Sequence, residues 1–404
     1  MKNLRIGFIK TGIYIGKSFL NIIYSLIKLC HSKNKVIMMS RQSNNPNLDF
    51  ILIEKEIIKR NKDVKIKMLC KKISKGFFAK IGYGFYILKC MYNLATARVC
   101  ILDGYSIPVS ILRHKKNLEI IQIWHAAGAI KKFGYQALNK EEGRAPEVAR
   151  LMNMHKNYSH VMAPSFATAE FYKEAFGIND DKIFINGMPR LDYIQDKEIG
   201  NKKQEMFFED YPEYKDKKTI LYVPTFRVNS DNQESIKKLI DSVDSAKYNL
   251  LLRFHPLNND GDEFERYLVD WKYNTSDLIR IADYIITDYS AVAFEACMLD
   301  KPLYFYVYDI NEYRQTRGLN IDPLDEMNNC SSMHIKELIR AIENYEYDFE
   351  ELKRFKQKYI GTSTSSNTEK LVDFIFNYLD LSKDIKDEKI KNNSNEYSKK
   401  ELNI

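Results

Sequence analysis

Short apolar runs rich in β-formers alternate with amphipathic stretches along most of the chain. The first series of predicted strands covers residues 35–40, 64–69, 98–103, 118–125, 160–165 and 182–190. Apolar residues with helical spacing fill much of the intervening sequence, at 50–60, 75–96 and 167–176. This alternation is typical of a parallel sheet covered by helices, so the pattern predicts an α/β fold.

A second series of strands and helices follows a polar, charged segment at residues 196–218. Its predicted strands are 218–227, 248–256, 282–290 and 301–309. Because 404 residues exceed what one hydrophobic core usually supports, we expect two domains, at 33–200 and 215–380. The end of the chain, residues 383–404, has the composition of a solvated, disordered tail.

Residues 1–32 are apolar but are interrupted by Lys10, Lys17 and Lys28. The uncharged stretch is shorter than the roughly 20 residues that span a bilayer. The lysines are seven and eleven residues apart, which places them on one side of a helix. The pattern predicts an amphipathic helix lying on an anionic membrane surface, with its lysines toward the headgroups. The alternative is a helix packed on its own domain.

The formal net charge of +8 indicates anionic partners, such as phosphorylated substrates, lipid headgroups or nucleic acid, or merely a lysine-rich solvated surface. The six cysteines include no CxxC pair and no signal peptide is evident, so we expect reduced thiols in the cytoplasm. No metal-binding constellation is visible. We therefore predict no metal and no cofactor.

Polar side chains close the apolar runs in both series of predicted strands. These residues are His125, Ser165, Arg190, Thr225, Arg227, His255, Asp288 and Ser290. Open parallel sheets bind ligands at the carboxyl ends of their strands. Eight such residues in two successive series predict a cleft lined from both domains.

Seven short motifs occur in a specific order between residues 98 and 320. They are WHAAGAIKKFG (124–134), APS (163–165), NGMPRLD (186–192), YVPTFR (222–227), FHP (254–256), ITDYS (286–290) with Glu295 downstream, and YFYVYDINEY (304–313) followed by RG (317–318). This ordered set resembles the CDP-glycerol glycerophosphotransferase family of teichoic acid synthesis. The resemblance implies a GT-B type fold, with two Rossmann-like domains facing across a cleft. It also implies transfer of a polyol phosphate from a CDP-activated donor to a hydroxyl of a membrane-bound acceptor.

Such a transfer needs an oriented hydroxyl, a base and positive groups near the phosphate. His125 is the candidate base, because a neutral imidazole can take the proton of an attacking alcohol. The small residues after it would let the backbone approach a ligand, and Lys131 and Lys132 would raise the local positive potential. A histidine at a strand end is, by itself, more often a structural residue.

Four further residues complete the expected donor site. By resemblance, His255 faces the donor phosphate. The guanidinium of Arg227 suits bidentate phosphate binding. Ser290 is the expected N-cap of a helix whose start attracts phosphate, and Glu295 is expected to contact the ribose. The alternatives are a structural turn at His255, an exposed Arg227, and simple capping by Ser290 with Glu295 on the surface.

The remaining candidates, Thr225, Asp288, Arg190 and Ser165, are less specific. Asp288 is equally suited to forming a turn, and Arg190 to pairing locally with Asp192. The sequence also departs from the family pattern, because alanines replace a Gly-Thr pair after the histidine and a second serine after Ser290. These departures remove hydroxyl donors, so the resemblance specifies the fold more firmly than it specifies the substrate.

The predicted function is transfer of glycerol phosphate or ribitol phosphate from its CDP donor to a lipid-linked glycan or polyol-phosphate acceptor, with release of CMP. We expect a peripheral protein on the inner face of the cell membrane that binds no nucleic acid. One alternative is a GT-B glycosyltransferase that uses a nucleotide sugar. Another is a basic protein without catalysis that binds membrane surfaces or nucleic acid.

Overall fold

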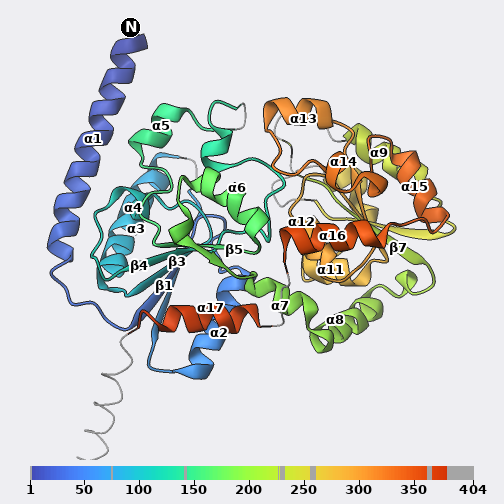
Figure 1. Ribbon diagram of the computed structural model, residues 1–404, viewed down its shortest axis with the longest axis horizontal. Coiled ribbons are helices and arrows are strands. Elements are labelled where there is room, and N and C mark those ends of the chain that lie inside the picture. The colour runs from blue at the N-terminus through green and yellow to red at the C-terminus, as the bar shows by residue number, and fades with distance from the viewer. Residues whose placement is uncertain are drawn as a thin grey trace, which may run out of the picture. The chain divides into compact units, whose positions relative to one another are not determined.

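The computed structural model describes residues 2–73, 76–140, 143–225, 227, 233–254, 261–361 and 366–379, with side chains omitted at 2–9, 77–81 and 261–262. It contains a six-stranded sheet of order β2-β1-β3-β4-β5-β6 and a five-stranded sheet of order β11-β10-β9-β7-β8 (Figure 1). The paired strands whose register is resolved all run parallel. The predicted α/β class is therefore confirmed.

The first sheet forms where the sequence carries its first series of apolar runs. Its strands are β1 (Lys35–Ser40), β2 (Lys65–Cys70), β3 (Val99–Leu102), β4 (Glu119–Gln122), β5 (His160–Ala163) and β6 (Ile183–Ile185). Every residue of β1 and β3 is buried, as expected for central strands of a sheet covered on both faces. The associated helices are α1 (Lys2–Ile27), α2 (Leu48–Arg60), α3 (Phe77–Thr96), α4 (Ile107–Ile111), α5 (Pro146–Leu151) and α6 (Phe166–Phe176).

The second sheet is also built from short strands with helices between them. Its strands are β7 (Lys218–Val223), β8 (Tyr248–Leu252), β9 (Tyr284–Thr287), β10 (Leu303–Tyr306) and β11 (Ser331–Ser332). The helices around it are α7 (Pro189–Gln195), α8 (Lys197–Asp210), α9 (Gln233–Ser242), α10 (Gly261–Phe264), α11 (Thr275–Ile281), α12 (Val292–Cys297), α13 (Ile310–Thr316), α14 (Pro323–Glu326), α15 (Ile335–Glu343) and α16 (Phe349–Tyr359), and α17 (Asn367–Phe376) ends the described chain. The polar, charged segment between the two predicted series, 196–218, contains α8.

By internal contacts the chain divides into two compact units. Unit 1 comprises residues 1–124, 147–161 and 368–404, and unit 2 comprises 125–146 and 162–367. The predicted domain limits at 33–200 and 215–380 stay predictions. Every described residue predicted for the site lies in unit 2, so these residues can be placed within a single compact body.

Helix α1 covers Lys2–Ile27 of the segment expected at 1–32, and two of its flanking and internal lysines contact the protein. The Lys17 Nζ donates to Leu151 O at 2.8 Å, and the Lys28 Nζ donates to Arg113 O at 2.9 Å. These two lysines therefore contact unit 1, and the amphipathic helix on a membrane surface stays a prediction. In the part of the chain that the structure describes, no helix has the length and apolarity needed to cross a bilayer.

Candidate active site

The loop that carries His125 starts earlier than the sequence predicted. The strand expected at 118–125 ends at Gln122, and the chain then turns at Trp124, which has a φ of 63°. The Gln122 side chain supports this turn by accepting a hydrogen bond from Trp124 N at 2.9 Å. A bulky residue with positive φ is uncommon, and such conformations cluster at functional sites. His125 follows directly and is half-buried.

The small residues after His125 serve internal packing. A Cβ added at Gly128 would lie 2.4 Å from Cζ of Phe294, a contact too short for any side chain. Phe294 belongs to α12, the helix that follows the ITDYS motif. The expected close approach of the backbone is therefore present, but the observed neighbour is an aromatic ring. This packing joins the first motif of the ordered set to the sixth.

The two lysines of the motif lie on a segment that pairs with residues 318–321. Lys131 forms an antiparallel bridge with Leu319, and Lys132 N donates to Gly318 O at 3.0 Å. Gly318 has a φ of +81°, and a Cβ there would lie 3.0 Å from Cδ of Lys132. The backbone conformation of the glycine in the RG motif therefore disfavours any side chain, and an added Cβ would also press on the Lys132 side chain.

Arg227 lies at the centre of a buried ionic cluster in unit 2. Its Nε donates to Asp309 Oδ2 at 3.0 Å, and its Nη2 lies 3.0 Å from Asp288 Oδ2. Its Nη1 donates to Thr225 O at 3.2 Å. Burial by itself would lower the pKa of Arg227, but Asp288 and Asp309 raise it well above its ordinary value. The guanidinium is therefore held permanently charged inside the protein.

Backbone and aromatic contacts complete this cluster. Both carboxylate oxygens of Asp288 accept a hydrogen bond from Thr225 N, at 2.9 and 3.0 Å. Tyr289 and Tyr313 stack with ring centroids 4.0 Å apart, and the Arg227 guanidinium lies 4.9 Å from the centre of the Tyr313 ring. These contacts bind the ends of β7, β9 and β10 together. The structure thus gives Arg227, Asp288 and the Thr225 backbone a structural role, and their contact with a donor stays a prediction.

Glu295 is buried, which excludes the alternative of a surface position. It accepts hydrogen bonds from Arg190 Nη1 at 3.1 Å and from Ser276 Oγ at 3.0 Å. These bonds link α12 to α7 and α11. One observed partner of Arg190, Glu295, is therefore 105 residues away in the chain. Asp192 accepts from the Asn367 backbone and side chain.

Both candidate serines lie at helix starts, with one correction. Helix α12 begins at Val292 with Ala291 as its N-cap, so the predicted N-cap position of Ser290 is wrong by one residue. The Ser290 Oγ still accepts a long hydrogen bond, 3.4 Å, from Val292 N. Ser165 caps α6 and donates to Tyr359 O at 3.0 Å. Its hydroxyl is buried in these contacts, which fits a structural role.

His255 lies outside the described residues. The prediction that two imidazoles converge on one donor therefore stays a prediction.

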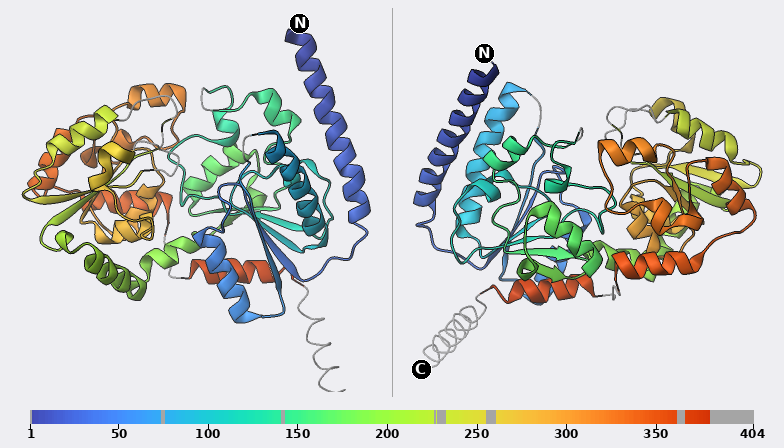
Figure 2. Two further views of the ribbon diagram at one scale, coloured as in Figure 1. Left: turned by 180° about the vertical axis from the view of Figure 1, so that it is seen from behind. Right: turned by 45° about the horizontal axis from the view of Figure 1, so that its top comes forward.

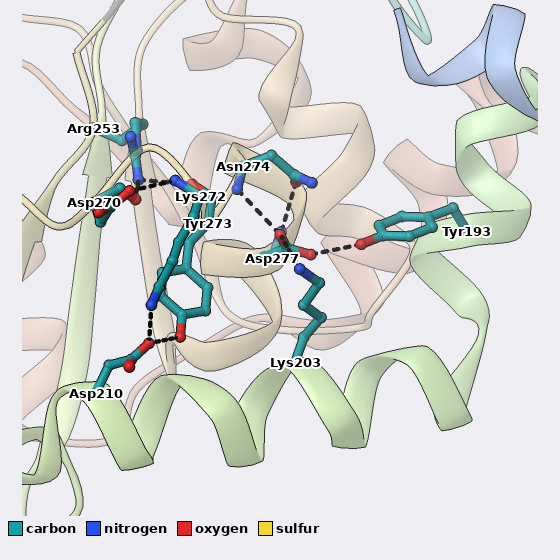
Figure 3. A network of polar contacts seen from close by, with 9 residues as sticks. All are labelled: Tyr193, Lys203, Asp210, Arg253, Asp270, Lys272, Tyr273, Asn274 and Asp277. Atoms are coloured by element: carbon teal, nitrogen blue, oxygen red, sulfur yellow. Dashed lines mark hydrogen bonds and ion pairs between the residues drawn. The ribbon is translucent and has the colours of Figure 1, made fainter.

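Two groups of residues in unit 2 were not predicted from the sequence. Asp309 is the last residue of the predicted strand 301–309, and Asp288 lies near the end of the predicted strand 282–290. This shared position at the end of a strand could have identified Asp309 from the sequence. The second group, seen in Figure 3, fastens α8 to the body of unit 2. Asp277 accepts hydrogen bonds from Tyr193 Oη at 2.8 Å and from Asn274 N at 3.1 Å, and lies 3.9 Å from Lys203 Nζ.

Asp210, near the end of α8, accepts from Tyr273 and lies 2.6 Å from Lys272 Nζ (Figure 3). Arg253, two residues before His255, donates to Tyr273 O at 2.8 Å. Burial lowers the pKa of Arg253. These contacts explain why the charged segment 196–218 is a packed helix: its charges have specific partners that composition does not reveal.

Comparison with known proteins identifies the fold and family. Residues 22–377 match the family model described as CDP-Glycerol:Poly(glycerophosphate) glycerophosphotransferase. The chain belongs to this family. The predicted enzyme class, a transferase of the glycerophosphotransferase type, is thereby confirmed. Among the described residues, no group of His, Cys, Asp and Glu is arranged to hold a metal ion.

Members with named activities match along much of their length. The chain is 31% identical over 370 residues to a teichoic acid ribitol-phosphate primase of Bacillus spizizenii, covering 89% of this chain and 94% of that protein. It is also 31% identical over 305 residues to a teichoic acid glycerol-phosphate primase of Bacillus subtilis, covering 73% and 77%. The wall teichoic acid polymerase TagF shares the fold, with a TM-score of 0.70 and 20% identity over 94% of this chain and 98% of that one.

Proposed function

We propose that this protein transfers a polyol phosphate from a CDP-activated polyol to a hydroxyl of a lipid-linked acceptor in the synthesis of a teichoic acid or a similar polymer. The observation that carries the proposal is the packing of Gly128 on Phe294. It holds the His125 loop in the same compact unit as the ITDYS and YFYVYD motifs. The similarity to two primases along most of their length supports this proposal.

In this mechanism an imidazole nitrogen of His125 takes the proton of the acceptor hydroxyl. The hydroxyl oxygen bonds to the phosphorus that carries the polyol. The bond from that phosphorus to the oxygen of CMP breaks, and CMP leaves with the electron pair. Such a reaction depends on positioning and on charge stabilisation. The turn at Trp124 and the anchored loop supply the positioning, and Lys131 and Lys132 supply positive charge beside it.

The cluster around Arg227 supports the reaction by holding the loop ends at which donors bind in parallel sheets. Its contribution is to position the segment after β7 against those after β9 and β10. Glu295 does the same for α12 through Arg190 and Ser276. Two additional roles are carried over from the family resemblance: His255 faces the donor phosphate, and the protein works at the inner face of the membrane.

The test is release of CMP by purified protein incubated with a lipid-linked acceptor and either CDP-glycerol or CDP-ribitol. Because a primase for each polyol is 31% identical to this chain over the matched residues, both donors are supplied. The proposal expects CMP with one of them, and near-complete loss in His125→Ala with little change in His334→Ala, an exposed histidine. Consumption of a nucleotide sugar, with no CMP from either polyol donor, would instead establish a glycosyltransferase.

A further inference from the structure

Helix α6 carries a tyrosine whose hydroxyl contacts the residue directly after His125. Tyr172 Oη donates a hydrogen bond to Ala126 O at 3.3 Å, and both residues belong to unit 2. Burial raises the pKa of Tyr172, so its hydroxyl keeps its proton and acts as a donor at neutral pH. The bond therefore restrains the backbone one residue beyond the candidate base.

The ring of Tyr172 is itself held in place by two other rings. It is 1% exposed and packs edge-on against Phe133 and Phe176, whose ring centroids lie 5.8 and 5.5 Å from its own. Phe133 and Phe176 also pack edge-on, at 5.3 Å, which closes a cluster of three aromatic rings. Because Ala126 and Phe133 belong to the same motif, Tyr172 contacts both ends of the loop that follows His125.

Helix α6 is anchored at both of its ends. At its start, Thr168 Oγ1 donates to Tyr359 O at 2.8 Å, beside the contact of the capping serine described above. At its end, the C-cap Gly177 has a φ of 64°, and a Cβ there would lie 3.2 Å from the Tyr135 ring. Tyr135 belongs to the short helix η1 (Gly134–Ala137), which contacts α6 (Figures 1 and 2). These contacts hold α6 against the loop that carries the candidate base.

Packing alone does not account for the hydroxyl of Tyr172. A phenylalanine would fill the same place in the cluster of three rings and would need no polar partner in the interior. The observed bond, at 3.3 Å, is longer than the usual distance of about 2.5–3.0 Å between two oxygens, so it contributes little to stability. Its effect on a rate is larger, because a displacement of about 1 Å at a reacting group can reduce a rate about a hundredfold.

We propose that Tyr172 is a positioning residue for the transfer reaction, because its hydroxyl holds Ala126 O and thereby sets the place of the His125 imidazole. This inference rests on the proposed function, since Tyr172 acts through the candidate base of that mechanism. Tyr172 itself touches neither the substrates nor the reacting atoms. Loss of its hydroxyl should therefore reduce turnover while donor affinity and folding are kept.

The variant Tyr172→Phe tests this role because it removes the hydroxyl and keeps the ring. With a lipid-linked acceptor and the donor that supports CMP release, kcat should fall about five- to fiftyfold, while donor affinity in calorimetric titration stays within about twofold. The matched control is Tyr347→Phe, because Tyr347 Oη donates to Leu303 O at 3.2 Å, at the start of β10. The control should keep the wild-type kcat. A wild-type kcat in Tyr172→Phe overturns the proposal.

A double-mutant cycle separates positioning of His125 from a general effect on the fold. If Tyr172 acts through His125, loss of its hydroxyl should cost nothing more once the imidazole is absent. His125→Ala and His125→Ala/Tyr172→Phe should then have the same residual kcat within about twofold. A further loss of about fivefold or more in the double variant assigns the effect to the fold and overturns the positioning role.

One measurement of the His125 ring requires no activity. The chain has seven histidines, so histidine-selective carbon-13 labelling gives few imidazole signals, and the signal missing from His125→Ala belongs to His125. Tyr172→Phe should shift or broaden this signal and leave that of His334 unchanged. Absence of CMP release by the wild type contradicts the proposed function, whereas an unchanged His125 signal in Tyr172→Phe contradicts the role of Tyr172. The two failures are therefore distinguishable.

Discussion

Replacing Arg227 with alanine would leave the buried carboxylate of Asp288 and the partly buried carboxylate of Asp309 without the cation that lies between them. Removing one partner of a buried ion pair costs about 3–5 kcal/mol. Loss of the contact with the Tyr313 ring adds about 0.5–2 kcal/mol. We therefore expect the free energy of unfolding to fall by at least ~3 kcal/mol, a large part of the roughly 5–15 kcal/mol typical of a domain.

Urea denaturation followed by tyrosine and tryptophan fluorescence measures this loss. Arg354→Ala, at an exposed arginine of α16, is the matched control and should change stability by less than about 0.5 kcal/mol. The free energy of unfolding of Arg227→Lys should lie between those of Arg227→Ala and Arg354→Ala. An ammonium keeps the charge but cannot reach Asp288, Asp309 and Thr225 O together.

The same variants distinguish the structural role of Arg227 from the predicted phosphate contact. Calorimetric titration with CDP-glycerol and CDP-ribitol measures donor affinity under conditions in which each variant is folded. If Arg227→Ala unfolds at the wild-type urea concentration and its donor affinity drops tenfold or more, the guanidinium binds phosphate and the structural interpretation fails.

Three further predictions concern the packing around the site and the attachment of α1. Gly128→Ala should reduce stability by about 1–3 kcal/mol and reduce CMP release, and truncation of Phe294 to leucine in the same chain should restore part of both; no loss in the single variant would contradict the close packing. Gly318→Ala should lower stability by about 1–2 kcal/mol in urea denaturation, because its φ of +81° disfavours any Cβ. His114 Nδ1 lies 3.0 Å from the Oη of Tyr24 in α1. Burial lowers the pKa of His114 to about 4, so the unfolded chain binds its proton first as the pH falls from 6.5. Stability should therefore decrease by up to ~1.4 kcal/mol per pH unit over that window, and His114→Gln should remove this part of the slope.

The sequence predicted the strands well because a buried parallel strand leaves a continuous apolar run. The same signal misplaced the end of β4. Residues 123 and 127–130 are as buried as the strand itself, so apolarity does not show where the sheet ends and a buried loop begins. The turn at Trp124 depends on a side-chain contact from Gln122, and no periodicity reports such a contact.

Partners were less predictable than positions. The sequence predicts Glu295 at a binding site because a charged residue within an apolar helix requires a polar partner. The observed partners of Glu295 include Arg190 and Ser276, which the fold brings to it from two other helices. The spacing of Arg190 and Asp192 suggests a local ion pair, whereas the contact of Arg190 with Glu295, 105 residues away, cannot be recognised from spacing.

Arg227 shows how two interpretations of one pattern can be separated. An arginine at the end of a parallel strand is typical both of phosphate binding and of a buried ionic cluster. The sheet order places β9 beside β7 and β10 beside β9, and acidic residues, Asp288 and Asp309, follow these two strands. When acidic residues follow the neighbouring strands, their carboxylates can pair with the arginine without any bound ligand. Strand order therefore identifies the structural partners of Arg227, and it becomes available only once the chain has folded; the contact with the donor stays a prediction.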